Sequence, residues 1–102
     1  MRNFQYINGQ LCCEQVPLAE IAEQAGTPCY VYSSGALGSA YDAYDEAFAG
    51  TDHLICFALK SCANLAVIKL LADRGAGADI VSRGELFRAL KAGVPGLSLI
   101  HI

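Results

Sequence analysis

Apolar and polar residues alternate along the chain in segments that have the lengths of strands and helices. Near the N-terminus the alternation is weak and surrounds Asn8-Gly9, a dipeptide favoured in two-residue hairpin turns. This predicts a small hairpin with strands near residues 3–7 and 10–14. A short amphipathic helix is expected over residues 17–25, because a proline stands at its first position and a glycine directly follows its last.

Farther along, the chain repeats one pattern three times: a short apolar segment typical of a buried strand, then a longer amphipathic segment typical of a helix. Tyr30, Leu54 and Ala78 are equivalent positions, so the repeat is 24 residues long. The expected strands are residues 29–32, 54–59 and 78–82, and the helices that follow them run from 35 to 48, through 65–72 up to Gly75, and through 86–90 up to Gly93.

Alternating strands and helices predict the α/β class. Strands that are apolar on both faces need helices to cover them and a crossover to return, which is the arrangement of a parallel sheet. No glycine-rich phosphate motif follows a strand, since Gly75-Ala76-Gly77 precedes one, and this argues against a dinucleotide site. Units of this length favour a (β/α)8 TIM-like barrel, which needs about 250 residues. The chain would supply the first three to four β/α units, an incomplete barrel.

Composition narrows the possible partners. The protein has 102 residues, of which 54% are hydrophobic and 17% charged, so it is expected to fold rather than stay disordered. Its net charge is −3 and no segment gathers Lys and Arg, which argues against nucleic-acid binding. The longest apolar run, residues 54–59, is too short to span a membrane, and no signal peptide begins the chain. We expect a cytoplasmic protein that binds neither nucleic acid nor membrane.

The cysteines predict free thiols. There are five, an odd number, and none forms a Cys-x-x-Cys pair or lies at metal-ligand spacing from a histidine, so we expect no metal site. Cys29 and Cys56 lie inside apolar segments, where a cysteine usually packs as a small hydrophobic residue.

Lys60 is the first candidate for chemistry. It closes the most apolar expected strand and precedes a polar loop, residues 61–64. In a barrel this is the rim where active sites are built, and a lysine amine there can act as a nucleophile toward an aldehyde. The alternative is a lysine that only extends its ammonium group from the strand end into water.

The residues around Lys60 resemble a known family. Residues 57–67 (FALKSCANLAV) and 75–86 (GAGADIVSRGEL) are similar to the first barrel strands of the diaminopimelate decarboxylase family. Residues 27–33 (TPCYVYS) resemble the segment that leads into its barrel, and the resemblance extends in order over about residues 4 to 95.

The resemblance implies a pyridoxal-phosphate enzyme of the alanine-racemase-like barrel type. The lysine matching Lys60 holds the cofactor as a Schiff base, so Lys60 would be the catalytic residue. Ala58 and Asp79 match positions that line the same cofactor pocket. The family commonly has asparagine where this chain has Cys62, while Asn64 is kept.

The implied activity is a lyase reaction of lysine biosynthesis, in which meso-diaminopimelate loses CO2 to give L-lysine. The family resemblance also implies a homodimer acting on a small amino-acid substrate. Another basic-amino-acid decarboxylase, acting on ornithine, arginine or carboxynorspermidine, remains open, as does a non-catalytic pyridoxal-phosphate-binding module. Much of the family's site lies farther along than residue 102, so we expect these 102 residues alone to be inactive.

Several residues have structural interpretations. Asp79 can instead pair with a neighbouring base such as Arg83. Ser82 and Glu85 have the spacing of a helix capping box, and His53 stands at a strand start, where a histidine is usually a loop residue. Helical spacing places three aromatic residues, Tyr41, Tyr44 and Phe48, in the expected core.

The expected organisation has three parts. Residues 1–26 form a hairpin and helix that would join the edge of a β-domain, and residues 27–96 form the first part of the cofactor-binding barrel. In residues 97–102 (LSLIHI) the resemblance has faded, and this hexapeptide is what one frame of a widely used transposase sequencing adapter encodes. We expect residues 97–102 not to be native, although their composition would let them form a strand.

Overall fold

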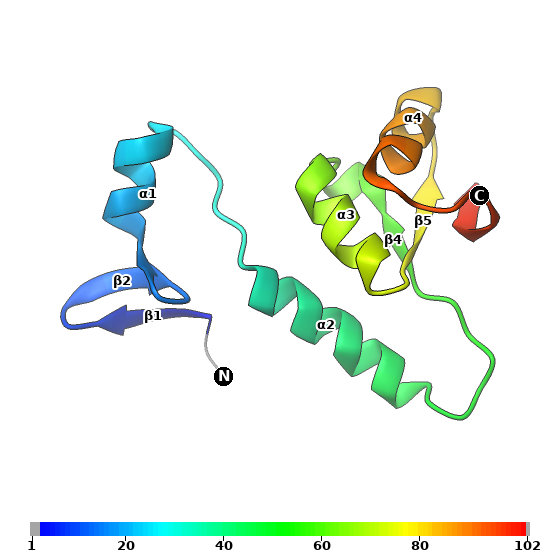
Figure 1. The fold of residues 1–102 in the computed structure, drawn as a ribbon, viewed down its shortest axis with the longest axis horizontal. Helices are drawn as coiled ribbons and strands as arrows, with labels where there is room; N and C mark the ends of the chain where they lie inside the picture. The colour runs from blue at the N-terminus through cyan, green and yellow to red at the C-terminus, as the bar shows by residue number, and fades with distance from the viewer. Residues whose placement is uncertain (1–2, 102) are drawn as a thin grey trace. The chain divides into compact units, whose positions relative to one another are not determined.

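The computed structural model describes residues 3–101 (Figure 1). The chain divides into two compact units between Leu37 and Gly38, within helix α2 (Ser34–Ala47). Among the residues described, no helix is long and apolar enough to cross a membrane.

The first unit contains an antiparallel sheet and one helix. The sheet has the order β1-β2-β3. Asn8 and Gly9 form the predicted hairpin turn, with φ values of 52° and 80° that match the left-handed conformation such turns require. The elements are β1 (Phe4–Ile7), β2 (Gln10–Cys13), β3 (Val16–Pro17) and α1 (Leu18–Ala25). The hairpin and the helix are therefore confirmed, and β3 is an additional short strand.

A carboxylate from this sheet caps helix α2. Ser33, which is buried, accepts a hydrogen bond from the Ala36 amide at 3.0 Å, as an N-cap serine does. Glu14, in the turn between β2 and β3, accepts hydrogen bonds at its Oε2 from the Ser33 hydroxyl at 2.8 Å and the Gly35 amide at 3.2 Å. A residue from the hairpin thus supplies the acid that stabilises the first turn of α2.

The prediction of a strand at residues 29–32 is wrong. These residues are in extended or irregular backbone and pair with no strand in the part of the chain described. Tyr30 is 91% exposed and Cys29 is exposed as well, so the expected burial of Cys29 is also wrong. An apolar segment becomes a strand only when a neighbour supplies complementary N–H and C=O groups, and apolar composition does not supply that neighbour.

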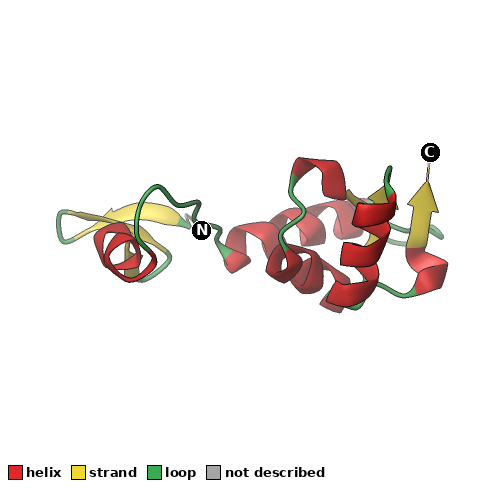
Figure 2. Cartoon of the chain, turned by 90° about the horizontal axis from the view of Figure 1, so that it is seen from above, coloured by secondary structure: helices red, strands yellow, loops and turns green. Residues whose placement is uncertain are grey.

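The second unit has a parallel sheet covered by helices, so the α/β class is confirmed at this level. The sheet order is β4-β5-β6, and every pairing is parallel. Its strands are β4 (Cys56–Ala58), β5 (Gly77–Ile80) and β6 (Leu99–His101), its helices are α3 (Leu65–Asp73) and α4 (Arg83–Ala92), and two 3-10 turns are η1 (Leu59–Ser61) and η2 (Gly96–Ser98). Strand β6 lies in the C-terminal hexapeptide, where composition had allowed a strand (Figure 2).

The core of this unit lies between the sheet and its two helices. Leu59 and Ala78 are fully buried, and Ile68 of α3 and Ala89 of α4 pack against them. Side chains alternate along a strand, so Asp79, next to Ala78, points to the opposite face of the sheet. That opposite face also carries Ala58, the register partner of Asp79.

Helix α2 contacts the Arg74 side chain at Gly38 and Asp42. The Arg74 guanidinium pairs with Asp42 at 2.8 Å and lies over Gly38, where a Cβ would approach it to 2.3 Å. Tyr44 and Phe48 are 64% and 51% exposed, so their expected place in the core is wrong. Helical spacing correctly indicated the helix, but the second unit covers only part of its apolar surface.

Candidate active site at the end of strand β4

Lys60 lies in the turn that directly follows strand β4. The strand ends at Ala58, one residue earlier than expected, and the chain then forms η1. Leu59, fully buried, anchors the turn in the core, while Lys60 is exposed. The Ser61 hydroxyl donates to the Ala58 carbonyl at 2.8 Å, and the Cys62 amide donates to the Leu59 carbonyl at 3.1 Å. The turn therefore presents the Lys60 amine to solvent on a backbone held from both sides.

Ala58 and Asp79 are direct neighbours across β4 and β5. Their Cα atoms are register partners, which places both side chains on the sheet face opposite the core. The Asp79 Oδ1 atom is buried and has no hydrogen-bond partner. Among the residues described, Asp79 and Arg83 make no ion pair, so the pairing considered for this acid is absent.

A buried, unpartnered carboxylate oxygen is costly unless a bound group completes it. Its location one strand from Lys60, at the end where parallel-sheet proteins build their sites, fits a pocket for a polar ligand. Lys60 offers an amine for covalent attachment, and Ala58, two residues earlier, carries only a methyl group. These residues fit pyridoxal phosphate, whose aldehyde reacts with lysine amines.

Cys56 lies on the same sheet face. A Cβ built on Gly77, its register partner, would approach the Cys56 sulfur to 2.9 Å, so the thiol occupies the space above Gly77. Burial raises the pKa of the Cys56 thiol, and the negative charge of Asp79 raises it further. The thiol is therefore kept in its neutral form beside the acid.

Residues 62–64 lead from the lysine into helix α3. The Asn64 side chain caps this helix by accepting hydrogen bonds from the Ala66 and Val67 amides at 2.9 and 3.2 Å. Cys62, at the position where the resembled family has asparagine, is partly exposed. The loop is thus fixed to α3 at Asn64.

Comparison with known proteins identifies the family of this site. Residues 34–102 match the family described as pyridoxal-dependent decarboxylase, pyridoxal binding domain. The chain belongs to this family. Pyridoxal phosphate is therefore the cofactor of the domain, and the family is one of decarboxylases.

Individual pyridoxal-dependent decarboxylases are similar over nearly all of the chain. Diaminopimelate decarboxylase of Haemophilus influenzae is 50% identical over 93 residues, covering 91% of this chain and 22% of that protein. The Pseudomonas aeruginosa enzyme of the same name is 53% identical, with the same coverage of both proteins. The chain therefore spans less than a quarter of the length of these curated relatives.

Solved structures of the family share the fold. A crystal structure from Aquifex aeolicus matches with a TM-score of 0.90 and 46% identity, over 97% of this chain and 24% of that one. A diaminopimelate decarboxylase from M. jannaschii, solved in complex with L-lysine, matches with a TM-score of 0.89 and 35% identity over the same shares. The described α/β arrangement is thus that of the N-terminal part of diaminopimelate decarboxylase structures.

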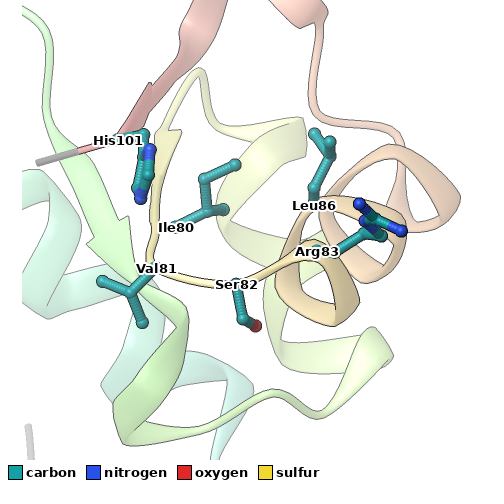
Figure 3. A pocket seen from close by; sticks show the side chains of 6 residues that line it. All are labelled: Ile80, Val81, Ser82, Arg83, Leu86 and His101. Carbon is teal, nitrogen blue, oxygen red and sulfur yellow. The ribbon is translucent and has the colours of Figure 1, made fainter.

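One cavity in this decarboxylase domain lies apart from Lys60. It has a volume of about 320 Å³ and lies at the end of β5 (Figure 3); the residues lining it are Ile80, Val81, Ser82, Arg83, Leu86 and His101. Neither Lys60 nor Asp79 lines it. Ile80 belongs to the core cluster of this unit, and Leu86 packs against that cluster. The cavity is therefore separate from the candidate site at Lys60.

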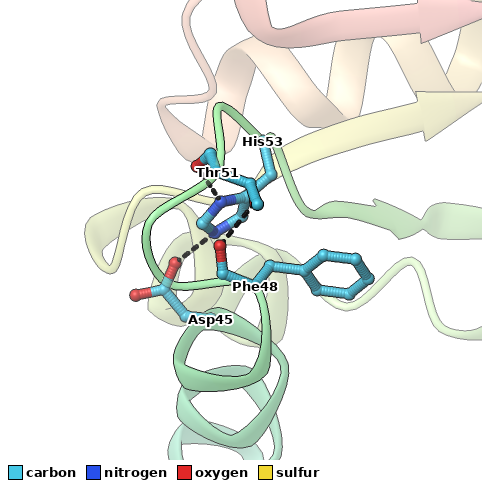
Figure 4. Close-up of polar contacts among 4 residues, drawn as sticks. All are labelled: Asp45, Phe48, Thr51 and His53. Carbon is cyan, nitrogen blue, oxygen red and sulfur yellow. Dashed lines mark hydrogen bonds and ion pairs between the residues drawn. The ribbon is translucent and has the colours of Figure 1, made fainter.

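His53 is a loop residue, as predicted. Its Nε2 pairs with Asp45 at 2.8 Å, and its Nδ1 lies 2.9 Å from the Thr51 carbonyl oxygen (Figure 4). These two acceptors raise the pKa of His53, the Thr51 carbonyl more than the Asp45 carboxylate. His53 therefore holds the loop after α2 against the end of that helix, and its ring also contacts the ring of Phe48.

Two features of the site were not anticipated from the sequence. Alternation along residues 54–59 could have placed Cys56 on the same face as Ala58, because side chains of one strand face share a period of two. Nothing local indicated a contact between the Lys60 loop and Arg88, since these segments are 25 residues apart. In the part of the chain described, no cluster of His, Cys, Asp or Glu could hold a metal ion.

Proposed function

We propose that this chain is the N-terminal portion of a diaminopimelate decarboxylase and that Lys60 holds pyridoxal phosphate covalently through its Nζ atom. The observation that carries the proposal is the placement of Lys60 directly after β4, beside the Ala58–Asp79 pair with its unpartnered buried oxygen. About 50% identity to proteins named diaminopimelate decarboxylase supports the substrate.

The strands and helices of residues 27–96 are, in this proposal, the first units of a (β/α)8 barrel. Two parallel strands, each followed by a helix on the same face, support it. Residues 1–26 would contribute to the edge of a separate β-domain.

Each residue of the site has a part in the proposed reaction. Asp79 Oδ1 would accept a hydrogen bond from a donor of the bound group, which relieves its unpartnered state. Pyridoxal phosphate, when bound, supplies an electron sink for the pair released as CO2 leaves. The Lys60 Nζ atom, freed when the substrate amine replaces it, would carry protons to and from the reacting carbon.

The substrate proposed is meso-diaminopimelate, with L-lysine and CO2 as products. Support comes from the M. jannaschii relative, whose structure was solved with L-lysine bound. The complete enzyme would be a cytoplasmic homodimer that acts on a small amino acid and binds neither nucleic acid nor membrane.

Reductive trapping tests the role of Lys60. Borohydride reduction of the complete enzyme loaded with pyridoxal phosphate, followed by peptide mapping, should place the pyridoxyl mass on Lys60. Lys60→Ala should abolish turnover, because both covalent attachment and proton transfer need that amine. The matched control is Lys69→Ala, since Lys69 pairs with Asp73 on the exposed side of α3. A pyridoxyl mass on Lys69 or Lys91 would overturn the assignment.

A further inference from the structure

A side chain from helix α4 contacts the loop that carries Lys60. The Arg88 guanidinium donates from Nη1 to the carbonyl oxygen of Ala63 at 2.9 Å. Ala63 lies three residues after Lys60, between turn η1 and helix α3. The hydrogen bond therefore connects the segment after Lys60 to helix α4, which follows strand β5.

The backbone before Lys60 and the backbone after it are held by different contacts. Before Lys60, the fully buried Leu59 fixes the backbone to the core. After Lys60, Cys62 and Ala63 are only partly buried, and the side chains of Ser61 and Asn64 are both engaged within the loop and its own helix. The Arg88 bond is the contact by which a separate element holds the carbonyl between these two residues.

Helix α4 is a rigid support for this contact. Ser82 caps its N-terminus by accepting from the Glu85 amide at 3.1 Å, and Ala89 and Ala92 are buried in the core. Arg88 is exposed and directly precedes the buried Ala89. A hydrogen bond from a charged donor is stronger than one between neutral groups, so a single such bond can hold an exposed carbonyl in one orientation.

We propose that Arg88 is a positioning residue for Lys60: by holding the Ala63 carbonyl, it keeps the 61–64 loop in one conformation and so keeps the Lys60 amine aligned with the site. The proposal deepens the proposed function of Lys60 and rests on it. Small misplacements of a reacting group reduce rates strongly, so the alignment matters even though Arg88 touches no reacting atom.

The test uses three variants of the complete enzyme. Arg88→Met removes the donors and keeps most of the stem, and Arg88→Lys keeps a cationic donor that can still reach toward the carbonyl. Lys91→Met is the matched control, because it removes a cation from the same helix. Amide hydrogen exchange at Cys62, Ala66 and Val67 reports on the loop without turnover, and the pH dependence of cofactor absorbance reports on Lys60.

Arg88→Met should accelerate exchange at the Cys62 amide of the loop and at the Ala66 and Val67 amides of the first turn of α3 by roughly three- to tenfold, because a hydrogen bond to a charged group is lost at an exposed site. It should lower kcat by a similar factor, leave KM little changed and shift the pH midpoint of the cofactor absorbance. Arg88→Lys should recover part of each effect, and Lys91→Met should show none.

Unchanged exchange and absorbance in Arg88→Met would overturn the positioning role. Should Arg88→Met not fold, Arg88→Lys is compared with Lys91→Met: faster exchange, a lower kcat and a shifted absorbance midpoint in Arg88→Lys alone would support the role, whereas identical behaviour of the two variants would overturn it. A pyridoxyl mass away from Lys60 in the unmodified enzyme is a separate result. That result would refute the proposed function, while the exchange data would still report on the loop contact.

Discussion

The Asp79 carboxylate is the least satisfied polar group of the described residues, because its buried Oδ1 atom has no hydrogen-bond partner. If Asp79 served stability alone, its Oδ1 atom would be expected to accept a hydrogen bond within the protein, since a buried acceptor without a donor lowers the free energy of unfolding. Its position opposite Ala58 and one strand from Lys60 instead suits an interaction with a bound group.

We therefore expect Asp79→Asn to lower the activity of the complete enzyme at least tenfold while moving its thermal midpoint by only about 2 °C or less, since no intramolecular hydrogen bond is lost. Steady-state kinetics and thermal unfolding check both parts. Asp73→Asn, at an exposed acid on α3, is the control and should leave the rate unchanged. An unfolded variant, or one with the full rate, would show that Asp79 is structural.

Glu14 illustrates a charge that supports structure. Hydrogen bonds from the Ser33 hydroxyl and then the Gly35 amide lower the pKa of Glu14, outweighing the opposing effect of burial. Because the folded pKa lies below the unfolded one, the stabilisation is complete above the ordinary pKa of a glutamate and is lost as pH falls through the folded value.

Glu14→Gln should accordingly lower the thermal midpoint of the protein by a few degrees at pH 7, and the difference from the unmodified protein should shrink toward pH 3. Thermal unfolding followed by circular dichroism between pH 3 and pH 7 measures it. Glu23→Gln, an exposed position on α1, should show no such difference. A difference that is constant with pH would exclude the carboxylate as its source.

At the scale of elements, helix caps were the most predictable features. Ser82 caps α4 as expected, although the Glu85 carboxylate accepts from the Val81 amide and not from Ser82, one residue away from the usual capping box. Asn64 caps α3 with two hydrogen bonds, so the loop after Lys60 ends at a defined residue.

Replacing Asn64 tests the contribution of this cap. Asn64→Ala should lower the free energy of unfolding by about 1 kcal/mol, because two amides of the first helical turn lose their acceptor. Asn64→Asp retains an acceptor oxygen and should keep most of the stability. Urea unfolding of the three proteins gives the comparison, and equal midpoints for all three would mean that solvent replaces the cap without cost.

At the scale of the whole molecule, the parallel sheet has two unpaired edges. β4 and β6 flank β5, and the outer edge of each has no strand beside it within the described residues. Such edges favour association, and a sheet face that carries Asp79 needs further structure to enclose a cofactor. The chain also covers less than a quarter of its decarboxylase relatives.

We expect the 102-residue chain alone to bind pyridoxal phosphate weakly and to release no CO2 from meso-diaminopimelate. Cofactor absorbance and a radiolabelled CO2 assay on the purified chain check this, with the complete enzyme as the positive control. Saturable decarboxylation by the chain alone would contradict the expectation and would mean that Lys60, Ala58 and Asp79 suffice for the reaction.

Local features of this protein were determined by its sequence. The Asn8-Gly9 turn, the caps of α3 and α4, and the order of strand, polar loop and helix around Lys60 follow from interactions between residues a few positions apart, which act through backbone dihedrals and nearby hydrogen bonds. The resemblance around Lys60 also led to the correct family.

Tertiary structure alone decided the rest. Whether residues 29–32 form a strand depends on a partner elsewhere in the chain, and the sequence pattern could not provide one. The contacts from Glu14 to Ser33 and from Arg88 to Ala63 join residues 19 and 25 positions apart. Such contacts, like the unpartnered oxygen of Asp79, depend on where the folded chain places remote segments, which short-range propensities do not encode.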